Sequence, residues 1–87
     1  MVKIWGKVIK NDKIIKQFVF EKDCNIDYAE FLTYTTEICY KLEIPTPVVI
    51  KTHIFNYAKY NYVRFLPSDF VEEVDFDKLL LENIDGR

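Results

Sequence analysis

The stretch NIDYAEFLTYTTEICYKLEIP, from Asn25 to Pro45, decides the fold because it encodes one amphipathic helix together with both of its ends. Asp27 is a predicted N-cap, and Glu30, three residues later, completes a capping box. Pro45 disfavours helical geometry in the residue before it, so the helix is predicted to end near Leu42. At about 100° per residue, one face collects Tyr28, Phe31, Leu32, Thr35, Ile38, Cys39 and Leu42. We therefore expect this helix to bury Leu32 and Ile38 against a sheet.

The segments on either side of the helix supply the predicted sheet. Apolar and polar residues alternate from Val2 to Lys10, and Asn11 and Asp12 then form a turn from which residues 13–20 return as a second strand. Gly6 interrupts the apolar face of the first strand, where a glycine indicates a bulge or the close approach of another element. Residues 78–84 are predicted to form a third strand, which pairs with the first.

The resulting prediction is an α+β fold in a single domain, 1–87. The N-terminal β-hairpin and the C-terminal strand form an antiparallel sheet, and the long helix (about 28–42) packs on it. A second short helix is predicted at about 52–60, capped by Thr52, although Phe55 and the β-branched residues also permit a strand there. Residues 48–50 are either a short strand or a buried tether.

The second strand of the hairpin carries apolar residues on both faces. By strict alternation, Ile14, Phe18 and Phe20 share one face, while Ile15 and Val19 share the other. A strand of this kind is typical of the interior of a sheet or of a sheet covered on both sides. We therefore expect the strand to be central in the sheet or covered on its second face.

Composition narrows the class of protein. The 87 residues include seven Phe, six Tyr and one Trp, so aromatic bulk compensates for a thin core. No apolar run approaches the length of about 18 residues that a membrane span needs, and no charged-then-apolar leader is present, which predicts a cytoplasmic protein without a membrane partner. Two cysteines are too few for a disulfide framework, and Cys39 is predicted to be a buried, reduced thiol.

Charge is unevenly distributed along the chain, although the net charge is only −2. Residues 1–22 contain six lysines against two acids, whereas residues 69–87 contain seven acids against two basic residues. Opposite charges pair well across neighbouring strands, so the preferred interpretation is a basic first strand beside an acidic last one. A surface for a charged partner is the alternative.

Three segments resemble a family of short uncharacterised bacterial proteins, found mostly in Gram-positive anaerobes. They are IWGKVIK at Ile4 to Lys10, IIK at Ile14 to Lys16, and RFLPSDFVEEVDFDKL at Arg64 to Leu79, and residues 66–77 are the most specific part. The matching positions are Trp5, Gly6, Arg64, Phe65, Phe70, Glu72, Asp75, Phe76 and Asp77. The chain departs from the pattern at Leu80, where relatives tend to carry an acid, and over residues 52–60, which are less charged here. The resemblance implies no particular activity.

The chain is poor in the residues that build active sites. Nucleophilic catalysis needs a Ser, Cys or Thr beside a base and an orienting group, but Ser68 follows a proline in a turn and Cys39 is predicted to be buried. The two glycines cannot form a phosphate-binding loop. We therefore predict that the protein is not an enzyme and binds no cofactor.

A metal site is also the weaker interpretation of the polar residues. Asp69, Glu72, Glu73, Asp75 and Asp77 could offer oxygen ligands to a hard cation, but they lack the glycine-bearing loop typical of calcium sites. We favour a solvated strand edge for them, with a cation site as the alternative. His53 is the sole histidine, so no histidine cluster can hold zinc.

Two binding functions compete. Lys3, Trp5 and Lys7 share one face of the first strand, which resembles a stacking platform with phosphate contacts for single-stranded nucleic acid. The aromatic excess indicates instead a protein interface anchored by tyrosines, with Tyr34, Tyr40, Tyr57 and Tyr60 as candidates. We favour a protein-protein interaction module, with another protein or a second copy of the chain as the partner. A nucleic-acid-binding module is the alternative.

Overall fold

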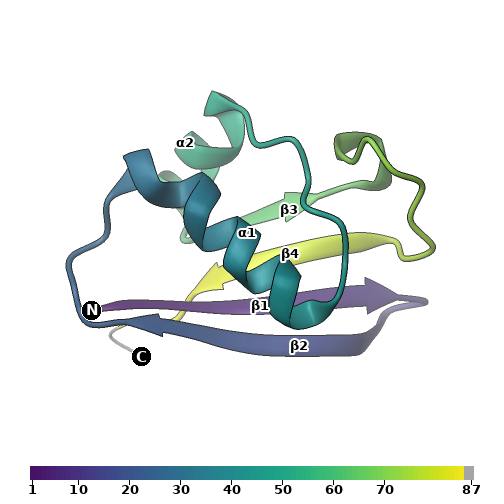
Figure 1. The fold of residues 1–87 in the computed structure, drawn as a ribbon, viewed down its shortest axis with the longest axis horizontal. Helices are drawn as coiled ribbons and strands as arrows, with labels where there is room; N and C mark the ends of the chain where they lie inside the picture. Colours follow the sequence, from purple (N-terminus) through teal and green to yellow (C-terminus); the bar gives the residue numbers. More distant parts are fainter. Residues whose placement is uncertain (86–87) are drawn as a thin grey trace.

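The computed structural model describes residues 1–85 and has an α+β fold (Figure 1). Its strands are β1 (Val2–Lys10), β2 (Lys13–Lys22), β3 (Tyr62–Phe65) and β4 (Lys78–Asn83), and its helices are α1 (Phe31–Leu42) and α2 (Lys51–Tyr60). Short 3-10 helices, η1 (Tyr28–Glu30) and η2 (Pro67–Asp69), precede α1 and follow β3. The strands form one antiparallel sheet in the order β2-β1-β4-β3. The predicted fold class is therefore confirmed.

The β1–β2 hairpin turns at the predicted residues. Asn11 and Asp12 have φ angles of 53° and 62°, the left-handed region that these two residue types tolerate. The pairing shifts between Val8 and Ile9, so Val8 lies opposite Lys16 while Ile9 lies opposite Ile14. This β-bulge moves Ile14 away from the row of Phe18 and Phe20, and the prediction that the three residues share a face is wrong.

The last strand pairs with the first, as predicted, and occupies an interior position because β3 lies on its other side. Strand β4 pairs with β1 from Ile4 opposite Asn83 to Ile9 opposite Lys78, and with β3 on its other side. Strand β3, which the predicted sheet did not include, completes the sheet. Residues 48–50 lie outside the strands, and Val48 and Ile50 are exposed, so the segment is a tether that is not buried.

Helix α1 follows most of the prediction made for it. Asp27 caps η1, and its Oδ1 accepts a hydrogen bond from the backbone N–H of Ala29 at 3.0 Å. The first predicted turn is thus a 3-10 turn, and the α-helix begins at Phe31. The helix ends at Leu42, because Glu43 adopts the left-handed conformation of a C-cap.

The exposure of Leu32 contradicts the sequence prediction. Ile38 is fully buried, but the side chain of Leu32 is 53% exposed. Tyr34 joins Phe31, Ile38 and Leu42 on the buried side of the helix, which centres that face away from Leu32 and leaves Leu32 at its border. Tyr28, also assigned to the buried face, is exposed.

Gly6 lets α1 approach the sheet closely. A Cβ atom built on Gly6 would lie 2.6 Å from Cγ2 of Ile38, a separation that real Cβ atoms do not tolerate. The close approach of another element, which the sequence offered as one reason for this glycine, is therefore the correct one. The contact between Gly6 and Ile38 also shows that the even-numbered residues of β1 point toward the helices.

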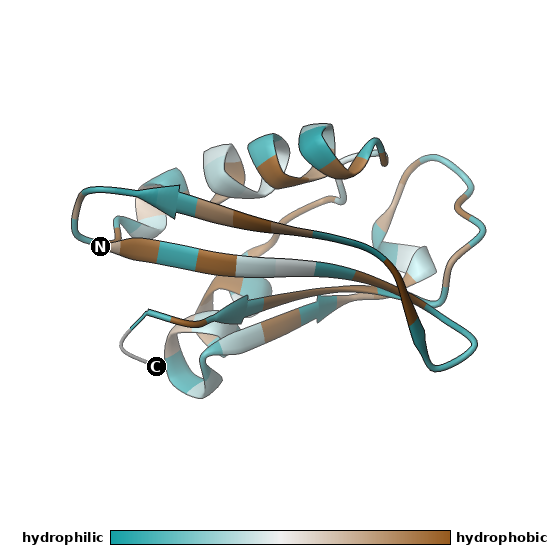
Figure 2. Ribbon diagram, turned by 90° about the horizontal axis from the view of Figure 1, so that it is seen from below, coloured by the Kyte–Doolittle hydropathy of each residue, from teal (hydrophilic) through white to brown (hydrophobic). Residues whose placement is uncertain are grey.

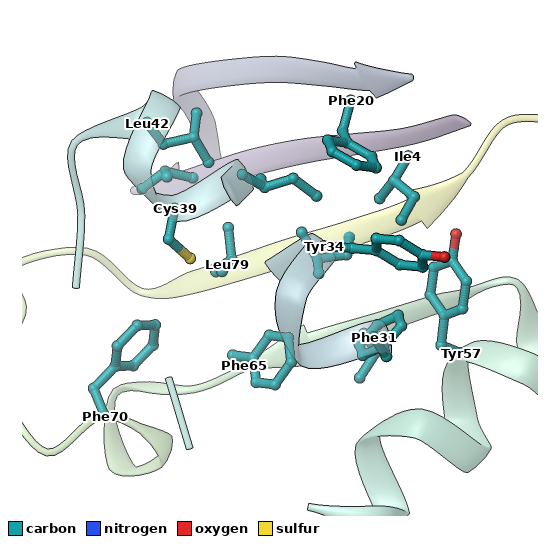
Figure 3. Packing of buried hydrophobic residues seen from close by; sticks show 14 of the residues in the cluster. Ile4, Phe20, Phe31, Tyr34, Cys39, Leu42, Tyr57, Phe65, Phe70 and Leu79 are labelled. Carbon is teal, nitrogen blue, oxygen red and sulfur yellow. The ribbon is translucent and has the colours of Figure 1, made fainter. Parts of the chain in front are cut away.

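The core lies between the sheet and the two helices (Figure 3). Its buried apolar side chains are Val2, Ile4, Val8, Phe20, Phe31, Tyr34, Ile38, Cys39, Leu42, Tyr57, Val63, Phe65, Phe70, Phe76, Leu79 and Leu81. Helix α2 confirms the helix predicted at 52–60, although Ile50 and not Thr52 is its N-cap. It packs Tyr57 against Phe31 with ring centroids 4.9 Å apart. Burial of large aromatic rings thus compensates for the short chain.

The opposite charges at the two ends of the chain meet within the molecule. Nζ of Lys7 lies 3.0 Å from Oε1 of Glu82, and Nζ of Lys10 lies 3.9 Å from Oδ2 of Asp75. The backbone N–H of Asn11 also donates to the carboxylate of Asp77 at 2.8 Å. The preferred interpretation of the charge distribution agrees with these contacts; the last residues of the acidic segment, 86–87, lie outside the described residues.

The position of β2 corrects the prediction made for it. This strand is neither central nor covered on both faces, because it forms one edge of the sheet (Figure 2). Both helices lie on the side of Gly6 and Ile38, and the opposite face carries Lys3, Trp5, Lys7 and Ile9 of β1 with their neighbours across the sheet. We call this the uncovered face. Among residues 1–85, no helix is long and apolar enough to span a membrane.

Candidate protein-binding surface

The free edge of β2 can be located to individual backbone groups. The carbonyls of Lys3 and Ile9 accept hydrogen bonds from Ile84 and Asp77, on the β4 side of β1. Because these groups alternate in direction along a strand, the even-numbered residues of β1 bond to β2 instead. Their partners in β2 include Lys16, Phe18, Phe20 and Lys22. The residues between them, Gln17, Val19 and Glu21, consequently point their N–H and C=O groups outward, and we call these groups the β2 edge.

Apolar side chains surround the β2 edge. Ile14, Ile15 and Val19 are 44%, 49% and 41% exposed, and Phe18 is half-buried. Natural proteins protect most edge strands by shortness, a covering element or charge, because an exposed apolar edge pairs with other strands. A ten-residue edge strand with four apolar side chains in reach of water is therefore a surface suited to pairing.

A groove runs beside this edge, between β2 and the solvent-facing flank of α1. Its volume is about 570 Å³, which is within the range of known ligand sites. It is lined by Phe18, Phe20, Glu21, Thr36, Glu37, Tyr40 and Lys41. The two phenylalanines form the floor, and Tyr40, which is 79% exposed, stands at the rim. We call this the α1–β2 groove.

The four predicted tyrosine anchors divide into two pairs. Tyr34 and Tyr57 are buried in the core, so their assignment to a binding surface is wrong (Figure 3). Tyr34 packs against Phe20 with ring centroids 5.5 Å apart, which fixes the floor of the groove from beneath. Tyr40 and Tyr60 are exposed, and of these two Tyr40 alone lines the α1–β2 groove.

The predicted nucleic-acid platform is occupied by contacts within the molecule. Nζ of Lys7 lies 3.9 Å from the centroid of the Trp5 ring and 3.0 Å from Glu82. Nζ of Lys3 lies 3.6 Å from Oε1 of Glu21. The Trp5 indole N–H donates to Gln17 at 3.1 Å. One ring face and both lysines are thus already engaged, which leaves little for stacking bases or neutralising phosphates.

His53 has a structural arrangement rather than a catalytic one. Its Nδ1 accepts a hydrogen bond from the backbone N–H of Ile50 at 3.0 Å, which caps α2, and its ring packs on Phe65. Its Nε2 lies 3.6 Å from Oδ1 of Asp69. The contacts of both ring nitrogens and of the ring face thus hold His53 between the start of α2 and the sheet.

The remaining nucleophile and metal candidates are equally constrained. Burial raises the pKa of Cys39 from its ordinary value of 9.0 to about 12, an effect that a hydrogen bond with Thr46 partly offsets. A thiol with this pKa is a poor nucleophile at neutral pH. Within residues 1–85, no three His, Cys, Asp or Glu side chains are grouped closely enough to hold a metal ion.

No family model matches the chain, and no curated protein or solved structure matches it either. The resemblance to short bacterial proteins stays a prediction. The β2 edge and the α1–β2 groove are therefore identified as a candidate binding surface from their geometry alone. The sequence did contain a signal for this surface, namely the apolar residues on both faces of residues 13–20.

Proposed function

We propose that this protein is a protein-binding module without catalytic activity, in which an extended segment of a partner pairs with the β2 edge as a fifth strand. Strand addition is a recurring mode of peptide recognition, in which backbone hydrogen bonds supply affinity and side-chain pockets supply specificity. The β2 edge offers the first component and the α1–β2 groove the second. A cytoplasmic location, predicted from the sequence, stays a prediction.

One observation carries the proposal. Strand β2 has the apolar composition of an interior strand, yet it lies at the edge of the sheet. Neither the core nor the turn requires Ile14, Ile15 and Val19 to be apolar, because all three side chains are exposed. A partner strand would turn β2 into the interior strand that its composition indicates.

A second copy of the chain is the less favourable partner. A twofold pairing of two β2 edges that brings Phe18 opposite Phe20 also brings Lys16 opposite Lys22. Like charges directly opposite one another destabilise a pair of strands. We therefore expect sedimentation to show a monomer across a range of concentration and salt, whereas a dimer that Val19→Pro dissociates would identify self-association as the function.

The location of the site is tested by capture from host lysate with matched variants. Val19→Pro removes one outward N–H while leaving the β1–β2 hydrogen bonds intact, since edge strands accept proline at such positions. Tyr40→Ala removes the rim of the groove, and Phe55→Ala, on exposed α2 surface, is the control. We expect a protein retained by the unmodified chain and by Phe55→Ala to be lost from the other two variants.

Two results would contradict the proposal. Equal capture by all four proteins would place the binding surface elsewhere. The absence of any captured protein, combined with a monomer in sedimentation, would remove the interaction function itself. Titration with single-stranded DNA at low salt tests the nucleic-acid alternative, for which we expect no binding because Lys3 and Lys7 are paired with carboxylates.

A further inference from the structure

The side chains of β2 that face the helix side form a defined row. Lys16 lies opposite Val8, Phe18 opposite Gly6, Phe20 opposite Ile4, and Lys22 opposite Val2. Residues directly opposite across a strand pair share a face, so these four side chains lie on the side of the helices. From one end to the other, the row has the order lysine, phenylalanine, phenylalanine, lysine.

The lysines at the two ends of this row have no acidic partner within the described part of the chain. No carboxylate lies within 4.0 Å of Nζ of Lys16 or Lys22 among residues 1–85, and the same holds for Lys13 at the start of the strand. Glu21, the acid of β2, contacts Lys3 on the uncovered face. The row of β2 therefore carries a lysine without an ion-pair partner among the described residues at each end of an apolar centre, with Glu37 on the far side of the α1–β2 groove and Glu43 and Glu73 in the pocket that Lys16 lines.

The geometry of strand pairing makes this row the part of β2 closest to a partner. Phe18 and Phe20 direct their backbone groups toward β1, so a strand added outside β2 meets them at positions without hydrogen bonds. At such positions the opposite Cα atoms are about 4.5 Å apart, compared with about 5.5 Å at hydrogen-bonded positions. Side chains of the partner opposite Phe18 and Phe20 would also enter the α1–β2 groove, next to Tyr40.

We propose that the partner segment has the alternating pattern acid-x-apolar-x-apolar-x-acid, with its apolar side chains opposite Phe18 and Phe20 and its carboxylates opposite Lys16 and Lys22. This inference rests on the proposed function and specifies the chemistry of its partner. The pattern is symmetric, so it suits a segment that runs parallel or antiparallel to β2. Positions marked x face the side of Gln17, Val19 and Glu21 and are less restricted.

The chain's own near matches cannot serve as this segment. Asp77, Leu79 and Leu81 follow the first three positions of the pattern with Asn83 at the fourth, but this segment forms the interior strand β4. Glu72, Val74 and Phe76 also follow the first three positions, but Lys78 occupies the fourth. Phe76 is buried in the core, and its ring packs edge-on against Phe70 at 5.4 Å. The segment would have to leave the core to pair with β2 of another copy, so the occupant is a different protein.

Three synthetic peptides with blocked ends test the inference on the full chain. The first has the sequence Glu-Thr-Phe-Thr-Phe-Thr-Glu, the second replaces both glutamates by lysine, and the third replaces both phenylalanines by serine. Binding is followed by the amide resonances of Gln17, Val19 and Glu21 during titration. We expect the first peptide to bind about tenfold more tightly than each of the others at low salt, and the advantage over the second to shrink in concentrated salt.

Variants of the protein test which residues cause the preference for the glutamate peptide. In Lys16→Glu/Lys22→Glu, we expect the lysine peptide to bind more tightly than the glutamate peptide, since both changed side chains are exposed and the fold does not depend on them. Val19→Pro is expected to weaken all three peptides, while Val19→Thr, which keeps the N–H, leaves binding intact.

Each outcome distinguishes this inference from the proposed function. Equal binding of the glutamate and lysine peptides, with shifts at the β2 edge, would overturn the charge pattern and leave strand addition standing. Equal binding of the phenylalanine and serine peptides would overturn the role of the groove in the same way. The absence of shifts at the β2 edge with every peptide would overturn both the inference and the proposed function.

Discussion

The two edges of the sheet are built differently. Strand β3 has four residues, α2 packs beside it, and Pro67 follows two residues after its end. These features restrict pairing at that edge. Strand β2 has ten residues and a bulge at the turn end, and α1 packs against its helix side. Shortness and a following proline account for the β3 edge within the molecule, whereas the exposed Ile14, Ile15 and Val19 of β2 have no such internal reason. Stability should therefore depend on the covered side of the sheet, and binding on the β2 edge.

Two residues of α1 give the largest expected contrast between covered and exposed positions. Ile38→Ala should lower the free energy of unfolding by about 2–5 kcal/mol, because it removes methyl groups from a fully buried site. Leu32→Ala, at an exposed site on the same helix, should change it by less than about 1 kcal/mol. Chemical denaturation measures both. Similar losses from the two variants would mean that the buried face of α1 is assigned incorrectly.

The contact between β1 and α1 predicts an intermediate loss. Gly6→Ala should cost about 1–3 kcal/mol, because the new methyl group meets Cγ2 of Ile38 at 2.6 Å. Ile38→Leu removes that Cγ2 atom, so the double variant should lose less than the sum of the two single changes. Additive losses in this double-mutant cycle would show that helix and strand do not meet at Gly6.

Alkaline pH provides a further test of the covered side. Burial raises the pKa of Cys39 to about 12 and also raises the pKa of Tyr57, to which Tyr28 and Asp85 contribute less. Each group stays protonated in the folded state at pH values where the unfolded chain has already lost the proton. Stability is therefore complete below about pH 9 and should fall as the pH rises from 9 toward 12.

The control for this pH dependence is Tyr57→Phe. The Tyr57 hydroxyl is buried without a hydrogen-bond partner among the described residues, so its removal should leave stability at neutral pH unchanged or slightly higher. The same change should reduce the loss of stability at alkaline pH. A variant with the same alkaline slope as the unmodified protein would mean that Tyr57 is accessible to solvent.

The smallest effects are expected along the β2 edge. Threonine at position 14, 15 or 19 keeps a β-branched residue in the strand, so Ile14→Thr, Ile15→Thr and Val19→Thr should each change the free energy of unfolding by less than about 0.5 kcal/mol. Ordinary surface changes alter the free energy of unfolding by about 0.5 kcal/mol. A loss above about 1 kcal/mol would therefore show that the changed side chain belongs to the core. Such a result would contradict the proposed difference between the β2 and β3 edges of the sheet.

Local signals in the sequence predicted much of the fold. The Asn11-Asp12 turn, the Asp27 cap, the end of α1 at Leu42 and the helix at 51–60 all depend on residues that are close together in the chain. The pairing of β4 with β1 followed from complementary charge at the two ends, which Lys7 and Glu82 realise in the structure. Short-range preferences and simple charge complementarity were sufficient for these elements.

The remaining features depend on contacts that periodicity does not encode. Burial of Tyr34 shifted the buried face of α1 away from Leu32, and the bulge beside Val8 moved Ile14 to a different row. The place of β2 in the sheet depends on where β3 and β4 insert, which the pattern of residues 13–20 cannot specify. Of the predicted binding residues, Tyr40 lines the α1–β2 groove, while the groove itself arises from tertiary packing.

Hydrogen exchange at the β2 edge tests the central claim most directly. In the free protein, the amides of Gln17, Val19 and Glu21 should exchange rapidly, whereas those of Phe18 and Phe20, which bond to β1, should exchange slowly. Addition of the Glu-Thr-Phe-Thr-Phe-Thr-Glu peptide should slow exchange at the three outward amides and leave the other two unchanged. Uniform protection along β2 in the free protein, or no added protection with the peptide at saturating concentration, would contradict a free edge that binds a partner strand.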